Sequence, residues 1–450
     1  MIYGGITMKR PSKLAVITVL STALITAITL TSCASDSGKA QSGKGTEATE
    51  SPEVKTPGVE KKTQSNKPFG IEEDRYAELL DMSFISTGNT YRLKKVIEKL
   101  RAGENVYIAA LGGSVTEGAG PSNYKDGYAY QFNKKLRAAY TPNDGANVFF
   151  NGAGLSGTPS QLGLVRYQSD VVDVLGHTPD LLIIEFAVND DGSDLSTRAF
   201  EALVRNALEA NDECAVIALY SAATYGNTAN QKKVVADFYG IPQVNVLALV
   251  QRATSANDFS KQDYYTDNVH PTKAGHEIQA DCLMNLLAKT DAAPADDAVS
   301  IPENWCKPKP LTNFTRILGD DENVKITASV FDGNDDYTQS IKKTGKGNFP
   351  KNWHHTSGQG SFVMEINCKA LILTYKEQGS WLSEKFGKAD VYVDGKLKAT
   401  YDGGKAGGWC NCVPVYIIDE EVAAKHTVEI KMADGEESKG FTIVAMGYSR

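Results

Sequence analysis

The feature that most constrains the fold is an alternation of apolar runs with amphipathic segments between about residue 70 and residue 290. The apolar runs are short and almost free of polar residues, as in strands of a parallel sheet covered by helices on both faces. Strands are expected at Val106–Leu111, Val148–Asn151, Leu181–Ala187, Ala215–Tyr220 and Pro242–Val246. Helices are expected at Tyr128–Tyr140, Gln161–Leu175, Thr197–Ala210 and Gln231–Tyr239, with a last helix after Pro271. The pattern predicts an α/β domain over residues 69–290 with a parallel five-stranded sheet.

The pattern changes after about residue 291. A segment rich in Pro, Ala and Asp follows, and beyond it come short alternating runs separated by turn residues. Asp394 and Gly395 stand between two such runs, which is a strong signal for a β-hairpin. We therefore expect an all-β sandwich of jelly-roll type over residues 300–450. These residues are expected to form a separable domain, so a chain ending near Ala293 should still fold and keep its activity.

The N-terminus has the pattern of an export signal. Lys9, Arg10 and Lys13 precede an apolar run that extends from Leu14 to Leu30. The site 30–33, Leu-Thr-Ser-Cys, resembles the lipobox of bacterial lipoproteins, which implies a signal peptide over residues 1–33 and a lipid on Cys33. A plain signal peptide or a signal anchor is the alternative. Residues 34–68 are polar and are expected to form a flexible linker, so the protein would be lipid-anchored to the cell membrane or surface, outside the cytoplasm.

Composition excludes some classes of function. The 450 residues carry a formal net charge of −8, so the basic surface of a nucleic-acid-binding protein is not expected. Two of the seven cysteines, Cys214 and Cys282, are expected to be buried free thiols. The cysteines of the last third are expected to be structural thiols or disulfides, because no pair has the spacing of a zinc site; they are Cys306, Cys368, Cys410 and Cys412.

Four segments with chemically useful residues follow predicted strands, where parallel sheets bind ligands. The first, Gly112-Gly113-Ser114, is a tight turn that can present a hydroxyl above the sheet, although Ser114 could equally be a helix N-cap. The second, NGAGLSGTPS, is a glycine-rich turn that lets the backbone approach a ligand closely. Either segment alone is weak evidence for a functional site.

The third segment ends in Asn189, whose side-chain amide can donate to a developing oxyanion or form an Asx turn. The fourth contains Asp267 and His270, three residues apart, before Pro271. At that spacing a carboxylate can bind one imidazole nitrogen and leave the other for a nucleophile, whereas the alternative is a solvated loop histidine.

Together and in this order, the four segments resemble the signature blocks of the SGNH, or GDSL-like, hydrolase superfamily over roughly residues 100 to 290. Its first block usually reads GDSxTxG, and this chain has GGSVTEG, with Gly113 in place of Asp. Its third block usually reads GxND, against AVND here, and its last block, DxxHP, matches fully. The resemblance implies a flavodoxin-like sheet order.

The resemblance also implies the roles of the residues. Ser114 would be the nucleophile of an esterase, His270 its base, and Asp267 the group that orients His270. The oxyanion hole would consist of the backbone N–H groups of Ser114 and Gly157, rather than Gly154, and the side chain of Asn189. His177 and His276 are expected to be surface or core residues, and this chemistry requires no cofactor and no metal.

The sequence constrains the identity of the substrate less than it constrains the catalytic residues. Exported SGNH enzymes with a β-sandwich resemble carbohydrate esterases, which favours an acetylated polysaccharide or small ester as substrate. Trp353, Trp381 and Trp409 could stack on sugars in the β domain, but at least two of them are expected to be core residues. The alternatives are a lipase, lysophospholipase or aryl esterase, a cell-envelope O-acyltransferase, and a non-catalytic carbohydrate-binding lipoprotein.

Overall fold

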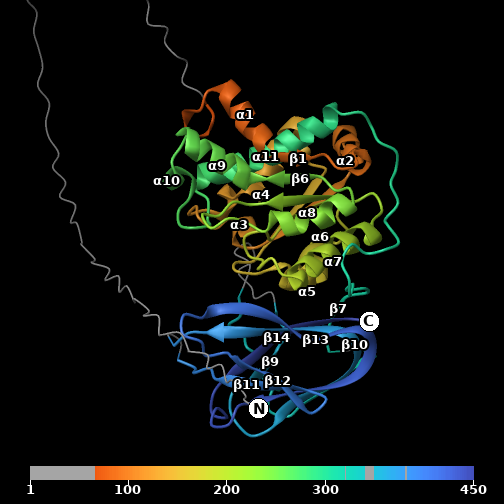
Figure 1. Ribbon diagram of the computed structural model, residues 1–450, viewed down its shortest axis with the longest axis vertical. Helices are drawn as coiled ribbons and strands as arrows, with labels where there is room; N and C mark the ends of the chain where they lie inside the picture. The colour runs from red at the N-terminus through yellow and green to blue at the C-terminus, as the bar shows by residue number, and fades with distance from the viewer. Residues whose placement is uncertain (1–65, 320, 340–348, 381–382) are drawn as a thin grey trace, which may run out of the picture. The chain divides into compact units, whose positions relative to one another are not determined.

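The computed structural model describes residues 66–450, except 320, 340–348 and 381–382. The expected signal peptide, Cys33, almost all of the expected linker, and Trp381 therefore lie outside the described residues. All described residues belong to one compact unit of the chain, which contains an α/β part followed by an all-β part (Figure 1). Within the described ranges, no helix has both the length and the apolar character needed to cross a membrane.

The α/β part is built on a six-stranded sheet with the order β1-β6-β5-β4-β2-β3. Its five parallel strands lie where the apolar runs predicted them and have the flavodoxin-like order; they are β2 (Val106–Gly112), β3 (Val148–Gly154), β4 (Leu181–Glu185), β5 (Ala215–Tyr220) and β6 (Gln243–Asn245). The expected number of five strands is wrong, because β1 (Phe84–Ser86) pairs antiparallel with β6 at the edge. A three-residue, half-buried strand is too short to show a pattern in the sequence.

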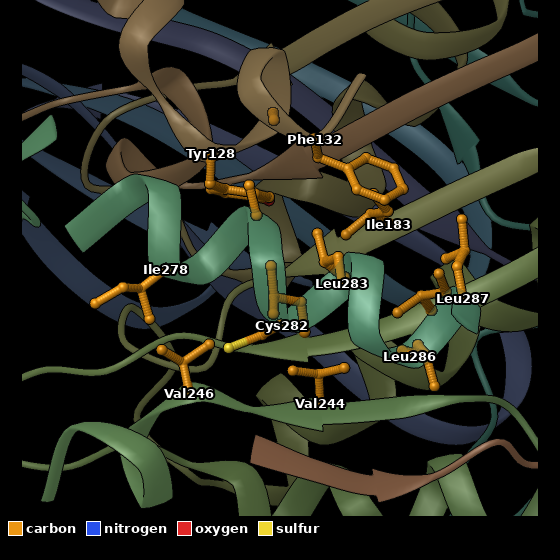
Figure 2. Packing of buried hydrophobic residues seen from close by; sticks show 14 of the residues in the cluster. Tyr128, Phe132, Ile183, Val244, Val246, Ile278, Cys282, Leu283, Leu286 and Leu287 are labelled. Atoms are coloured by element: carbon orange, nitrogen blue, oxygen red, sulfur yellow. The ribbon is translucent and has the colours of Figure 1, made fainter. Parts of the chain in front are cut away.

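Helices cover both faces of this sheet (Figure 1). One face packs against α1 (Glu73–Ser83), α2 (Tyr91–Ala102), α4 (Tyr128–Tyr140), α9 (Val246–Ala256) and α11 (Lys273–Ala292). The other packs against α5 (Ser160–Tyr167), α7 (Asp194–Ala210) and α8 (Ala229–Phe238). Figure 2 shows α11 directing Cys282 and Leu283 into the core with Val244 of β6 and Val246 at the start of α9. The helix expected at Gln161–Leu175 is interrupted after α5 by a π-helical turn at Gln168–Val172 and resumes as α6 (Asp173–Leu175).

The β part is an eight-stranded antiparallel sheet whose longest strands, β10 (Ser361–Gln378) and β13 (Trp409–Met432), pair along most of their length. The expected hairpin is formed by β11 (Lys388–Val393) and β12 (Lys396–Asp402). Its turn residues Asp394 and Gly395 have φ values of 50° and 74°, as a two-residue hairpin turn requires. The remaining strands are β7 (Thr315–Arg316), β8 (Val324–Ala328), β9 (Trp353–His355) and β14 (Phe441–Ser449).

The cysteines of the described residues are all free thiols. Cys214 and Cys282 are buried, as predicted. For the cysteines in the last third of the chain, the sequence allowed either free thiols or disulfides. The structure has free thiols: Cys368, Cys410 and Cys412 are buried in the β part, and Cys306 is partly exposed.

The two parts share apolar contacts. Leu155, Leu162 and Val165 of the α/β part lie in one buried cluster with side chains of the β sheet, among them Ile372 and Val444. An ion pair of 2.9 Å between Arg198 and Asp419 also joins the two parts. Because these side chains of the α/β part are almost completely buried, the β sheet serves as part of their core.

We therefore predict, against the sequence-based expectation, that a chain ending at Ala293 is less stable than the full chain. Truncation would expose Leu155, Leu162 and Val165, and fully exposing such a side chain costs roughly 1.5–3 kcal/mol. Thermal unfolding followed by circular dichroism should show a lower melting temperature, with reduced hydrolysis of a small ester. A truncated chain that melts at the temperature of the full chain would contradict a shared core.

Candidate active site

Ser114 is the first residue of α3 (Ser114–Glu117), directly after the turn at the end of β2. A Cβ atom on the preceding residue, Gly113, would lie 2.0 Å from the Asn189 Oδ1 atom, so any side chain there would require the Asn189 side chain to move. The Ser114 side chain is buried, and its hydroxyl oxygen lies 2.8 Å from His270 Nε2. Ser114 is the first helical residue rather than the N-cap, so its hydroxyl is committed to the imidazole and not to capping the helix.

His270 and Asp267 lie in the loop between α10 (Lys261–Tyr264) and α11. The Asp267 Oδ1 atom accepts hydrogen bonds from the backbone N–H groups of Val269 and His270, both at 2.8 Å. Its other oxygen, Oδ2, lies 2.6 Å from His270 Nδ1. A further backbone bond of 2.8 Å, from Thr266 N–H to the His270 carbonyl, closes the loop. The structure thus brings Ser114, His270 and Asp267 into one chain of hydrogen bonds.

The charge of Asp267 decides the tautomer of His270. Partial burial acts to raise the pKa of Asp267, but the backbone N–H groups of His270 and Val269, together with the His270 ring, outweigh it, so the pKa is lowered. A carboxylate accepts hydrogen bonds only, so Nδ1 of His270 carries the proton of their shared bond. Nε2 is then free to accept the proton of the Ser114 hydroxyl, as a general base must.

Asn189 lies in the turn after β4, against Gly113. Its Oδ1 atom is buried, lies against Gly113 and has no hydrogen-bond partner within the described residues. The next residue, Asp190, is held firmly: its carboxylate accepts from the Ser160 N–H at 2.7 Å and pairs with Lys232 at 2.5 Å. Asp190 and Lys232 are buried, so this pair fixes the turn that carries Asn189.

Gly157 lies in the loop between β3 and α5. Its φ of 67° is in the left-handed region, and a Cβ atom would lie 2.9 Å from the Trp409 ring of the β part, so glycine is required on both counts. The preceding residue, Ser156, donates its hydroxyl proton to Glu117 of α3. The loop therefore contacts the turn of the nucleophile on one side and the β part on the other.

Arg166 was not singled out from the sequence, yet its buried side chain joins the two strand ends at the site. Its guanidinium donates to the Gly112 carbonyl at 2.7 Å and the Ala153 carbonyl at 2.8 Å. Asp170, one turn further along the chain, pairs with it at 3.1 Å. The sequence signal that could have identified Arg166 is a single charged residue in the otherwise uncharged α5 segment, whose residues are all buried.

Glu185 at the end of β4 was also missed. It is fully buried and accepts a 2.8 Å hydrogen bond from Thr116 of α3, whose own oxygen lies 2.8 Å from the Tyr128 hydroxyl. Burial raises the pKa of Glu185 to about 7, although the hydroxyls of Thr116 and Ser221 act to lower it. The sequence signal that could have identified Glu185 is an acidic residue at the end of an otherwise apolar strand.

The remaining candidate histidines lie away from this chemistry. His276 is buried and receives the Tyr128 N–H on Nδ1, so its Nε2 donates to the Ala119 carbonyl at 2.9 Å. Burial lowers the pKa of His276 to about 4, which keeps it neutral. His177 stacks on Tyr107. In the part of the chain that the structure describes, no group of three or more His, Cys, Asp or Glu side chains could hold a metal ion.

Comparisons with known proteins agree with this architecture. The GDSL-like Lipase/Acylhydrolase family matches residues 110–278. The chain is similar to a two-domain esterase active on acetylated mannans, with 25% identity, a TM-score of 0.68, and coverage of 82% of this chain and 98% of that chain. A structure of such an esterase co-crystallised with mannopentaose matches at 24% identity and a TM-score of 0.70, over 82% of this chain and 97% of that chain. A search of curated protein sequences gives no significant match.

We predict that Glu185 makes the stability of the protein fall as pH rises. Below the ordinary pKa of 4.5 the carboxyl is neutral in both the folded and the unfolded protein, but between 4.5 and about 7 only the folded protein keeps the proton. Charging the buried group above pH 7 therefore costs about 3 kcal/mol of unfolding free energy. Urea unfolding of wild type and Glu185→Gln should show that the variant gains relative stability between pH 5 and pH 8.

Glu104→Gln, at an exposed glutamate, is the control and should track the wild type at both pH values. A wild-type-to-Glu185→Gln difference that does not change with pH would mean that the carboxyl is charged in the folded protein throughout this range.

Proposed function

We propose, from the membership of residues 110–278 in the GDSL-like lipase/acylhydrolase family, that this carboxylic ester hydrolase removes acetyl groups from an extracellular polysaccharide through an acyl-enzyme on Ser114. The observation that carries the proposal is the chain of hydrogen bonds from Asp267 through His270 to Ser114. A hydroxyl, a neutral imidazole and a carboxylate in this order are the means by which proteins turn a serine into a nucleophile.

In the first half of the reaction, Ser114 Oγ attacks the acetyl carbonyl carbon while His270 Nε2 takes the hydroxyl proton. Asp267 stabilises the imidazolium that results. The carbonyl oxygen becomes an oxyanion, which we propose is bound by the N–H groups of Ser114 and Gly157 and the amide of Asn189. The bond from the carbonyl carbon to the sugar oxygen then breaks, and His270 returns its proton to that oxygen, which releases the deacetylated sugar.

In the second half, a water molecule attacks the acetyl-serine, and His270 accepts one of its protons. The same donors bind the second oxyanion. When the ester bond to Ser114 breaks, His270 gives the proton back to Oγ and acetic acid leaves, which then loses its proton to the solvent and becomes acetate. Each half begins and ends with neutral His270, so the site needs no external acid or base.

The surroundings of the site offer aromatic surface for a sugar. A hollow of about 460 Å³ lies beside the catalytic loop, on the side of Asp267, and is lined by Thr224, Lys261, Gln262, Tyr265, Thr266, Asp267 and Asn268. Two exposed aromatic rings border the site, since Trp409 lies against Gly157 and the Tyr225 hydroxyl bonds to the Val188 carbonyl at 3.2 Å. Exposed aromatic faces of this kind suit the apolar faces of sugar rings.

The choice of polysaccharide rests on the similarity to the two-domain esterase active on acetylated mannans, which includes both parts of the chain. Two other tryptophans after residue 300 are described: Trp353 packs against the core of the β part, with its ring centroid 5.5 Å from that of Phe362, and Trp305 packs against the α/β part, with the Arg205 guanidinium 4.8 Å from its ring. Trp409 is therefore the tryptophan that favours sugar binding. We accordingly propose an acetylated mannan as the substrate class.

We predict that wild-type protein releases acetate from acetylated mannan, and hydrolyses nitrophenyl acetate faster than nitrophenyl esters of long acyl chains. Ser114→Ala and His270→Ala should each reduce kcat by several orders of magnitude, and the double variant should be little worse, because the two act as a unit. Asn189→Ala should cost on the order of 10²–10³ in kcat through the loss of one oxyanion donor. Acetate release measured enzymatically gives the rates.

His177→Ala is the control for histidine loss, because that ring lies away from the site. A serine-directed organophosphonate followed by mass spectrometry identifies the nucleophile. An adduct on another serine, or full activity of Ser114→Ala, would refute the mechanism, and a preference for long acyl chains would refute the substrate.

We propose further that a lipid on Cys33 holds the enzyme on the outer side of the cytoplasmic membrane. Support comes from the sequence 30–33 after an apolar run. Cys33→Ala should no longer incorporate labelled fatty acid and should either leave the membrane fraction or remain unprocessed. Labelling of Cys33→Ala equal to that of the wild type would contradict the anchor, and Cys214→Ala, at a buried thiol, is the control.

A further inference from the structure

A residue of the β part contacts the peptide unit that carries the expected oxyanion donor. The carbonyl oxygen of Ser156 accepts a hydrogen bond from the side-chain amide of Gln339. This carbonyl and the N–H of Gly157 belong to the same planar peptide unit. In a trans peptide the two groups point in opposite directions, so a partner that fixes the carbonyl also fixes the direction of the N–H.

Gln339 is itself fixed. Its side chain is buried, and its Oε1 atom accepts from the backbone N–H of Cys412 in β13 at 3.2 Å. Because the oxygen end of the amide is committed to an N–H group, the nitrogen end must face the Ser156 carbonyl. The ring of Trp409, three residues before Cys412, lies against Gly157 and limits movement of the same loop.

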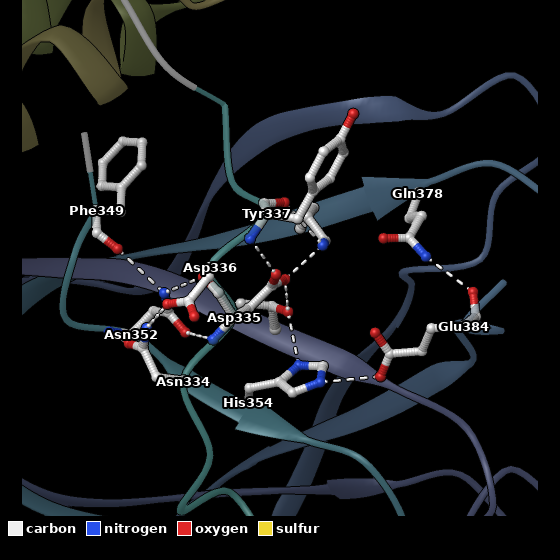
Figure 3. Close-up of polar contacts among 11 residues, drawn as sticks. Asn334, Asp335, Asp336, Tyr337, Phe349, Asn352, His354, Gln378 and Glu384 are labelled. Carbon is white, nitrogen blue, oxygen red and sulfur yellow. Dashed lines mark hydrogen bonds and ion pairs between the residues drawn. The ribbon is translucent and has the colours of Figure 1, made fainter. Parts of the chain in front are cut away.

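The segment that leads to Gln339 is anchored by a buried polar cluster around Asp335 (Figure 3). The Asp335 carboxylate pairs with Lys376 of β10 and accepts from the Thr442 hydroxyl at 2.7 Å and from the Tyr337 N–H at 2.9 Å. Lys376 also donates to the Tyr337 carbonyl at 3.1 Å. Asn352 accepts from the Asp335 N–H at 2.8 Å. These contacts join the segment to strands β10 and β14 and to the residue that precedes β9, so Gln339 is presented from a rigid support.

The α/β part holds the same loop from the other side. Glu117 of α3 accepts the Ser156 hydroxyl, and the Leu155 N–H donates to the Gly112 carbonyl at 3.0 Å. These contacts place the loop beside the turn of the nucleophile, but neither involves the 156–157 peptide group. Among the described residues, Gln339 is the side chain that bonds to the carbonyl of that peptide.

We propose that Gln339 is a positioning residue of the oxyanion hole: by binding the Ser156 carbonyl it aims the Gly157 N–H at the oxyanion formed on attack by Ser114. The inference rests on the proposed serine mechanism. A hydrogen bond on the carbonyl also polarises the peptide and so strengthens its N–H as a donor. The β part would then complete the catalytic apparatus, in addition to any contact it makes with the substrate.

The test is kinetic. Gln339→Met keeps the size of the side chain but removes both hydrogen bonds, and Gln339→Glu, assayed at pH 8, keeps an acceptor for Cys412 N–H while removing the donor. With nitrophenyl acetate, we expect kcat to fall about 10- to 100-fold in both variants. This decrease is no larger than the decrease in kcat expected when a whole oxyanion donor is removed. KM should change less than threefold. The inhibition constant of methylboronic acid, which forms a tetrahedral adduct on serine, should rise by the same factor as kcat falls.

Gln359→Met, at an exposed glutamine of the β part, is the control and should behave as wild type. Thermal melting identifies a variant that does not fold, in which case Gln339→Glu decides the question. Unchanged kcat in a folded variant, or a rise in KM alone, would overturn the proposal. In parallel, acetate release by the wild type that is abolished in Ser114→Ala would show that the proposed function holds. A failure of the Gln339 proposal can therefore be distinguished from a failure of the proposed function.

Discussion

The buried guanidinium of Arg166 joins the ends of β2 and β3, and the rest of the site is built on these two ends. One end leads to the nucleophile turn at Ser114, and the other leads to the loop that contains Gly157. A buried cation costs several kcal/mol, and hydrogen bonds and an ion pair reduce that cost; Nη1 and Nη2 of Arg166 make them, whereas its Nε atom has no partner among the described residues. Arg166 therefore favours only those backbone arrangements in which the carbonyls of Gly112 and Ala153 face the same side chain. The distance between nucleophile and oxyanion loop follows from that requirement.

Other buried charges extend the same principle around the site. The pair formed by Asp190 and Lys232 fixes the turn of Asn189, and the pair formed by Asp335 and Lys376 fixes the approach to Gln339. Apolar residues of the same size could fill these positions with less loss of hydration. Ionic pairs, however, allow one geometry, because each oxygen and each proton needs a partner in a defined direction. Such buried ion pairs lower the stability of the fold somewhat, but they hold the site residues in the geometry that the reaction needs.

The parts of the fold that the sequence predicts well are those with a local pattern. β5 and α4 have their expected bounds, because an uninterrupted apolar run and a regular amphipathic repeat leave one interpretation. The contact of Asp267 with His270 depends on residues three positions apart, and it too was expected. Gln339 was not expected, since its partner Ser156 lies 183 positions away and nothing near it in the chain indicates the contact. The same holds for Glu185, whose partner Thr116 is 69 positions away.

The close approach of Asn189 to Gly113 has a consequence for how this sequence can diverge. The SGNH blocks that this chain resembles usually carry Asp where it has Gly113, but here the carboxamide of Asn189 fills the space that a Cβ atom would need. The two positions are therefore coupled: the Asn189 side chain has to move before position 113 can accept any side chain. Because Asn189 is also the expected oxyanion donor, a substitution at Gly113 would disturb the site through a residue that lies far from it in the sequence.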